Sequence, residues 1–176
     1  MSTIFRATAD FVDAVRTDLI RPHAFAHERI GFITVRAAAG SKQVVLLAEE
    51  YYPVADEDYI DDRRVGARIG QEALRKALNL ALLNPVGVFH VHMHLLPSYR
   101  HWFSRIDLSE QLNFVPDFFK VRADMPHGAL VLSPRSAAGI VWTAPDAAQP
   151  IGEFNFVGAQ LQIVRAAPDG STGYNG

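Results

Sequence analysis

The strongest constraint on the fold is a run of three histidines spaced two residues apart, within Val86–His94. Successive side chains of a β-strand point to opposite faces, so this alternation of histidine and apolar residues predicts a strand with His90, His92 and His94 on one face. Residues i and i+2 lie about 6.6 Å apart along a strand, which lets two imidazoles converge on one ion. Asn84-Pro85 should end the preceding element.

The rest of the chain reads as an alternation of helices and strands. Apolar residues at helical spacing predict a helix that begins at Thr8 or Asp10 and ends at Arg21-Pro22, and a second helix over 65–83. Runs rich in β-branched residues predict a hairpin of strands 30–35 and 43–48. We also expect a short helix from Ser104 and strands at 128–132, 139–142 and 154–164. This order predicts an α+β fold with a mixed or antiparallel sheet.

Composition limits the possible classes of protein. The 176 residues are enough for one well-buried core, so we expect a single domain over residues 1–165 and a disordered tail over 166–176. The net charge of -2, without a Lys/Arg-rich run, argues against a nucleic-acid partner. The sequence contains no cysteine, so any metal must be held by histidine and carboxylate.

Neither a signal sequence nor a membrane anchor is evident. The first fifteen residues lack a basic segment followed by an apolar one, and no stretch of about 18 apolar residues occurs. We therefore expect a cytoplasmic protein with no membrane partner.

A metal site on the histidine strand would need a further ligand. Catalytic zinc usually has three protein ligands and an open fourth position, and Asp107 is the best candidate for the third. The segment Ser104-Arg-Ile-Asp107 also has the form of a helix capping box, which by itself is the commoner role of such a pattern. The histidine cluster upstream favours the metal interpretation.

Taken in order, Glu28, His92-Met-His94 and Ser104-Arg-Ile-Asp107 resemble the JAMM motif of the JAB/MPN metalloprotease family. The segments 126–133 and 138–142 are similar to the strand pair that follows the helix in small prokaryotic JAB proteins. The resemblance covers roughly residues 10–165. It implies a JAB/MPN (cytidine-deaminase-like) domain, in which helices flank a mixed, curved sheet.

The resemblance also implies a role for each motif residue. His92, His94 and Asp107 would hold Zn2+, Glu28 would move a proton between the attacking water and the leaving amine, and Ser104 would stabilise the oxyanion. The pair His90 and His92 remains an alternative ligand pair, although it lengthens the interval to Ser104. With His92 and His94 as ligands, His90 would either support the ligands or face the substrate. In the loop that follows, His101 and Trp102 are further candidates for contact with the substrate.

By the same resemblance the substrate is an amide bond at the C-terminus of a ubiquitin-like protein, cleaved during maturation or deconjugation. E1-like and E2-like proteins of the same pathway would be partners. Small prokaryotic relatives act in modifier pathways, some of them linked to antiviral defence.

Two other functions are compatible with parts of the sequence. The run His90 to His94 also fits the histidine-triad pattern of nucleotide hydrolases and transferases, in which His92 would attack a phosphate. That function needs hydrogen-bond donors near the phosphate, and it gives no role to Glu28 or Ser104-x-x-Asp107. A catalytically inactive MPN-type binding scaffold is the other possibility, and the presence of every motif residue argues against it.

Overall fold

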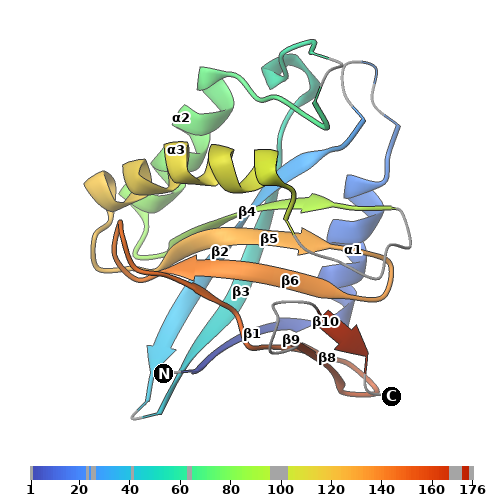
Figure 1. Cartoon of the computed structure of the whole chain (residues 1–176), viewed down its shortest axis with the longest axis vertical. Helices are drawn as coiled ribbons and strands as arrows, with labels where there is room; N and C mark the ends of the chain where they lie inside the picture. Colours follow the sequence, from blue (N-terminus) through green and yellow to red (C-terminus); the bar gives the residue numbers. More distant parts are fainter. Residues whose placement is uncertain are drawn as a thin grey trace.

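The computed structural model describes residues 2–22, 24, 27–40, 42–62, 65–95, 103–166 and 172–174. They form one curved, mixed sheet with helices on both faces (Figure 1), which confirms the expected α+β class. The strand order is β10-β9-β8-β1-β3-β2-β4-β5-β6-β7. The strands are β1 (Ser2–Thr8), β2 (Ile30–Ala39), β3 (Gln43–Pro53), β4 (Gly87–Met93), β5 (His127–Leu132), β6 (Ala137–Trp142), β7 (Ala148–Pro150), β8 (Glu153–Val157), β9 (Gln162–Ala166) and β10 (Thr172–Tyr174).

The helices are α1 (Ala9–Leu19), α2 (Gln71–Leu83) and α3 (Arg105–Val121), with a single 3-10 turn, η1 (Asp56–Asp58). Helix α1 begins after an N-cap at Thr8, whose hydroxyl accepts from Phe11 N–H; of the two starts that the sequence allowed, Thr8 and Asp10, the structure has Thr8. Helix α2 begins six residues later than expected because residues 65–70 form a loop against Asp58 and Glu28. Helix α3 runs through Pro116 to Val121, so it is longer than the short helix expected.

The expected hairpin is confirmed, since β2 and β3 pair antiparallel. Three parallel pairs, β1 with β3, β1 with β8 and β4 with β5, make the sheet mixed. Strand β1 was missed by the sequence analysis, and the single strand expected over 154–164 is two antiparallel strands, β8 and β9. Strand β10, within the expected tail, pairs with β9.

The alternation along each strand separates two apolar layers. Side chains such as Ile33, Phe89 and Leu130 pack with α1 on one face of the sheet. Their chain neighbours Phe32 and Val88 pack beneath α2 and α3 on the other face. His90 and His92 are in register with Phe32 and Ile30 of β2, so both histidines belong to the face that carries α2 and α3.

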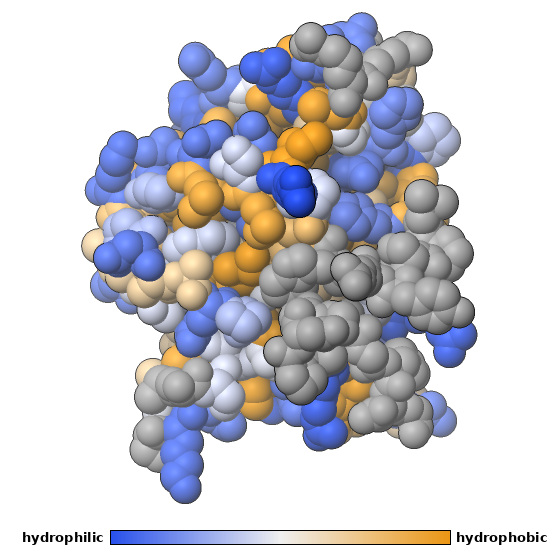
Figure 2. All heavy atoms as spheres, in the orientation of Figure 1, coloured by the Kyte–Doolittle hydropathy of each residue, from blue (hydrophilic) through white to orange (hydrophobic). Residues whose placement is uncertain are grey.

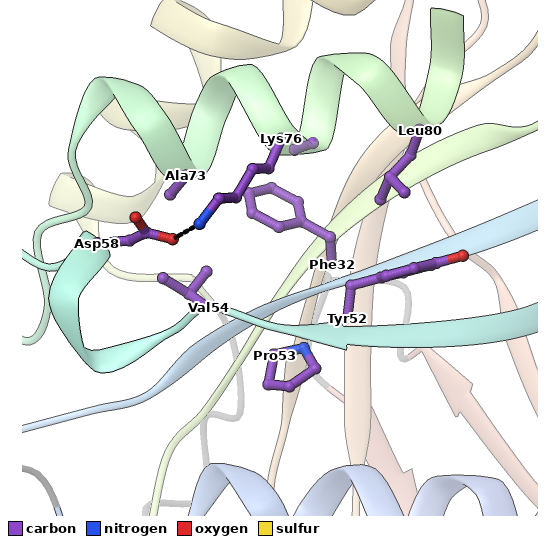
Figure 3. Close-up of a pocket in the computed structure, with 9 residues that line it drawn as sticks. Phe32, Tyr52, Pro53, Val54, Asp58, Ala73, Lys76 and Leu80 are labelled. Atoms are coloured by element: carbon purple, nitrogen blue, oxygen red, sulfur yellow. Dashed lines mark hydrogen bonds and ion pairs between the residues drawn. The ribbon is translucent and has the colours of Figure 1, made fainter. Parts of the chain in front are cut away.

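A small hollow of about 140 Å³ lies beneath α2, between Phe32, Val54 and Leu80. Its charged end is the ion pair between Lys76 Nζ and Asp58 Oδ2, at 2.7 Å (Figure 3). The pair ties α2 to η1, and the Gly70 N–H, just before the helix, donates to the Asp58 carbonyl. None of the helices in the described part of the chain has the length and hydrophobicity needed to cross a membrane.

Candidate metal centre

Strand β4 is buried in the sheet, and its histidines lie at the edge of the layer formed by α2 and α3. The side chain of His92 is 2% exposed, whereas that of His94, just beyond the end of β4, is 22% exposed. The His94 N–H continues the pairing with β5 by donating to the Leu132 carbonyl. The Nε2 atoms of His92 and His94 are 3.2 Å apart, so the two rings converge on one point.

Asp107 reaches the same point from the first turn of α3. Its Oδ2 lies 3.6 Å from His92 Nε2 and 3.8 Å from His94 Nε2. The backbone N–H of Ser104 donates to that oxygen at 2.6 Å, and the Asp107 N–H donates to Ser104 Oγ at 3.1 Å. The capping box and the approach to the histidines therefore occur together, because one carboxylate has enough lone pairs for both.

Glu28 comes from the segment before β2. Its Oε1 is 3.9 Å from His94 Nε2, and its backbone N–H donates to the Gly66 carbonyl. The neighbouring Arg29 is buried, and its guanidinium donates to Asp56 and to the carbonyls of Arg21 and Pro22. This anchor, whose role the sequence analysis missed, holds the backbone next to Glu28 in place.

The donor set fits a divalent transition metal. Ligand atoms about 2.0–2.1 Å from a tetrahedral zinc ion lie about 3.3–3.4 Å from one another. The distances among His92 Nε2, His94 Nε2 and Asp107 Oδ2 are 3.2, 3.6 and 3.8 Å, close to this spacing. Glu28, His92 and His94 also form a group, with ligand atoms within 4.8 Å of one another, that could hold a metal ion. Asp107 is nearer to both imidazoles than Glu28 is to His94.

Electrostatics keep the Asp107 carboxylate charged and the neighbouring His90 neutral. Burial raises the pKa of the Asp107 carboxyl, but His92 and the hydrogen bonds from Ser104 outweigh it, so the net pKa is well below its usual range. Burial lowers the pKa of His90 to about 3, so this imidazole stays neutral beside the cluster. An ionised carboxylate is the form of Asp107 that binds a metal.

A cleft of about 630 Å³ opens beside this cluster, between α2, α3 and the loop 65–70. Among the described residues that line it, five are carboxylates and one is an arginine, Arg68, which lies 3.4 Å from Asp62. The carboxylates are Glu28, Asp62, Asp107, Glu110 and Asp117. Among the described lining residues, acidic side chains therefore outnumber basic ones. On the face in Figure 2, hydrophobic residues lie among hydrophilic ones. Helix α3 has two exposed apolar side chains, Ile106 and Leu112.

The structure brings together five of the residues that the sequence singled out, namely Glu28, His92, His94, Ser104 and Asp107. His90 lines the cleft but is only 8% exposed, between the rings of Phe32 and Phe114. His101 and Trp102 lie outside the described residues. Gln111, which the sequence analysis did not single out, is a buried polar residue of the same cleft. Its one signal was its position four residues after Asp107.

A scan against protein-family models and a search of curated proteins both found no match to this chain. Inference about function therefore rests on the residues and their geometry.

Proposed function

We propose that this protein is a zinc-dependent hydrolase of the JAMM type with a JAB/MPN fold, which cleaves an amide bond at the C-terminus of a ubiquitin-like protein. One observation carries the proposal. Two imidazole nitrogens from the end of β4 and one carboxylate oxygen from α3 lie within 3.2–3.8 Å of one another, and a second carboxylate, Glu28, is 3.9 Å from His94. Three ligands and a neighbouring base are the parts that metal-assisted amide hydrolysis needs.

Each motif residue has a defined task in this proposal. Bound at His92, His94 and Asp107, zinc would polarise the scissile carbonyl and make water acidic enough to act as a nucleophile near neutral pH. Glu28, whose side chain is 30% exposed, would accept a proton from the attacking water and deliver it to the leaving amine. Ser104 Oγ accepts from the Asp107 N–H, which leaves its own hydroxyl proton available to the oxyanion.

The carboxylates among the described lining residues favour an amide substrate over a nucleotide. A phosphate approaching His92, as histidine-triad chemistry requires, would meet Asp107 at 3.6 Å from the attacking imidazole and further carboxylates along the cleft wall. Like charges at such distances are strongly unfavourable in a partly buried site. A peptide or isopeptide is neutral at its scissile bond and carries no such penalty.

The resemblance of the motif is the basis for proposing a ubiquitin-like substrate and E1-like and E2-like partners. It is also the basis for proposing a cytoplasmic, prokaryotic setting with a link to antiviral defence. The metal chemistry follows from the residues of the site, so it can be tested separately from the substrate.

The test measures zinc in the purified, untagged protein by elemental mass spectrometry, beside a His94→Ala/Asp107→Ala double variant. We expect about one zinc per chain in the wild type and almost none in the double variant. Glu110→Gln is the matched control, because Glu110 lies on the same helix and lines the same cleft; it should keep its zinc.

The same preparations are then incubated with a ubiquitin-like protein extended by a C-terminal peptide, and with adenosine 5′-phosphoramidate. Zinc-dependent cleavage of the extended protein supports the proposal. A metal-free wild type that hydrolyses the phosphoramidate would overturn it and make His92 the nucleophile. If the protein binds zinc but no preparation cleaves either substrate, the result would favour a scaffold that binds partners.

A further inference from the structure

Four buried side-chain polar atoms cluster where β4 meets α3, and in the described part of the chain none of them has a hydrogen-bond partner. They are His90 Nδ1, His92 Nδ1, Gln111 Nε2 and Gln111 Oε1. Gln111 is 1% exposed and His92 is 2% exposed, so bulk water does not compensate these groups. An unpaired buried donor or acceptor costs about 1–3 kcal/mol, so a cluster of four requires an explanation.

Apolar side chains surround the two histidines. In the sheet, His92 is in register with Ile30 on one side and Val131 on the other, and His90 with Phe32 and Ala129. Above them, α3 buries Val115, Phe118 and Phe119 in addition to Gln111. Gln111 is therefore the polar member of the buried face of α3.

The spacing along α3 places Gln111 between the two imidazoles. Asp107, Gln111 and Phe114 are at positions i, i+4 and i+7, which lie on one face of a helix. Asp107 is next to His92, with 3.6 Å between Oδ2 and Nε2, and the Phe114 ring lies 5.4 Å from the ring of His90. The residue between them on that face of the helix is Gln111.

We propose that Gln111 is a positioning residue for the metal centre, which bridges the two histidines with its carboxamide. Gln111 Oε1 accepts a hydrogen bond from His92 Nδ1–H, and Gln111 Nε2–H donates to His90 Nδ1. Both bonds would require the Gln111 carboxamide to turn from its present position, and together they would satisfy all four buried atoms.

The bridge has a chemical consequence at the site. The nitrogen that carries the proton in a neutral imidazole is set by the hydrogen bond that the other nitrogen makes, and metal-binding histidines are commonly fixed in this way. With its proton held on Nδ1 by Gln111, His92 keeps the lone pair of Nε2 free for a metal ion bound between His92, His94 and Asp107. This inference rests on the proposed metal site but does not depend on the identity of the substrate.

The test is nitrogen-15 NMR of the histidine side chains in the full-length, metal-free protein near pH 7.5. We expect the wild type to show His92 protonated on Nδ1 and His90 protonated on Nε2. Gln111→Met keeps the volume and removes both hydrogen bonds. It should shift His92 toward a mixture of its two neutral tautomers, with the proton on Nδ1 or on Nε2. Gln111→Glu keeps the acceptor for His92 and should restore the wild-type signature there. Asn113→Met, on the exposed side of the same cleft, should change neither histidine.

Zinc affinity, measured by competition with a chromophoric chelator, is the second readout. Loss of a group that orients a ligand commonly weakens metal binding about 10–100-fold, so Gln111→Met should do so and Asn113→Met should not. An unchanged His92 signature and an unchanged zinc affinity in Gln111→Met would overturn the inference. The NMR signature needs no turnover, so an inactive wild type would count against the proposed hydrolysis without affecting this test.

Discussion

The oxygen of Asp107 that lies 3.6 Å from His92 Nε2 also accepts a hydrogen bond from the backbone N–H of Ser104 at 2.6 Å. One carboxylate thus caps helix α3 and faces the histidines of β4. The cap holds the Asp107 side chain in one rotamer before any ion arrives, and such preorganisation lowers the entropic cost of binding. The helix end and the candidate metal centre are consequently one structural unit.

The two roles of this unit are separable by substitution. Asp107→Asn keeps an oxygen that can accept from Ser104 N–H but loses the charge, so zinc affinity should fall by at least about 100-fold while thermal stability changes little. Ser104→Ala removes the acceptor for Asp107 N–H and should lower the free energy of unfolding by about 1 kcal/mol with zinc content unchanged. Chelator competition and denaturant unfolding measure the two effects. If Asp107→Asn kept its zinc affinity and lost thermal stability instead, Asp107 would have the capping role alone.

Glu28 is expected to act in the chemistry and not in holding the metal. Glu28→Gln should keep about one zinc per chain and lower kcat about 10²–10⁴-fold, because a carboxamide cannot accept the proton from water. Elemental analysis and turnover of the extended ubiquitin-like substrate are the measurements. Loss of zinc in Glu28→Gln, with zinc retained in Asp107→Asn, would exchange the roles of the two carboxylates.

Gly66 gives an independent route to the position of Glu28. A Cβ at residue 66 would lie 2.5 Å from Glu28 Oε2, so Gly66→Ala should displace the carboxylate. We expect a loss of kcat of up to about 10²-fold with normal zinc content, as misplacement of a catalytic group by about 1 Å commonly produces. The end of the Glu28 side chain can move, so the folding stability should be almost unchanged. Wild-type turnover by Gly66→Ala would argue against a precise role for Glu28.

His127 predicts how stability depends on pH. This buried imidazole accepts from the Val88 N–H through Nδ1, and its Nε2 lies 2.9 Å from the Arg122 carbonyl. Burial lowers the pKa of His127 below its usual value of 6.5, so below that pH the unfolded chain binds a proton that the folded protein does not. Stability should therefore fall as the pH drops below about 6.5.

The control for this effect is His127→Phe. The substitution leaves Val88 N–H without its acceptor, so at pH 8 it should lower the free energy of unfolding by about 1–3 kcal/mol. It also removes the titrating group, and the loss of stability between pH 7 and pH 5 should become smaller than in the wild type. The measurement is urea unfolding of the wild type and of His127→Phe at several pH values. If the stability of both depends equally on pH, His127 does not contribute to the pH dependence.

Local patterns in the sequence were enough to predict several parts of the structure. The alternation around His92 specified a strand, and the Ser104-x-x-Asp107 pattern specified a helix start, because side-chain periodicity and capping depend on residues a few positions apart. The absence of cysteine restricted a metal site to histidine and carboxylate. The hairpin of β2 and β3 was likewise predictable from two β-branched runs around a short turn.

Only the tertiary structure decided which of these residues meet. Glu28 approaches His94 from the segment before β2, which the Arg29 anchor and the register of β2 with β4 hold in place. Asp107 approaches it from the first turn of α3. Strand β1 could not be predicted because its place between β3 and β8 depends on partners far along the chain. The unpaired carboxamide of Gln111 was equally hidden, since burial is a property of the packed core and not of local sequence. Periodicity determines local conformation, whereas long-range packing determines which side chains share a site.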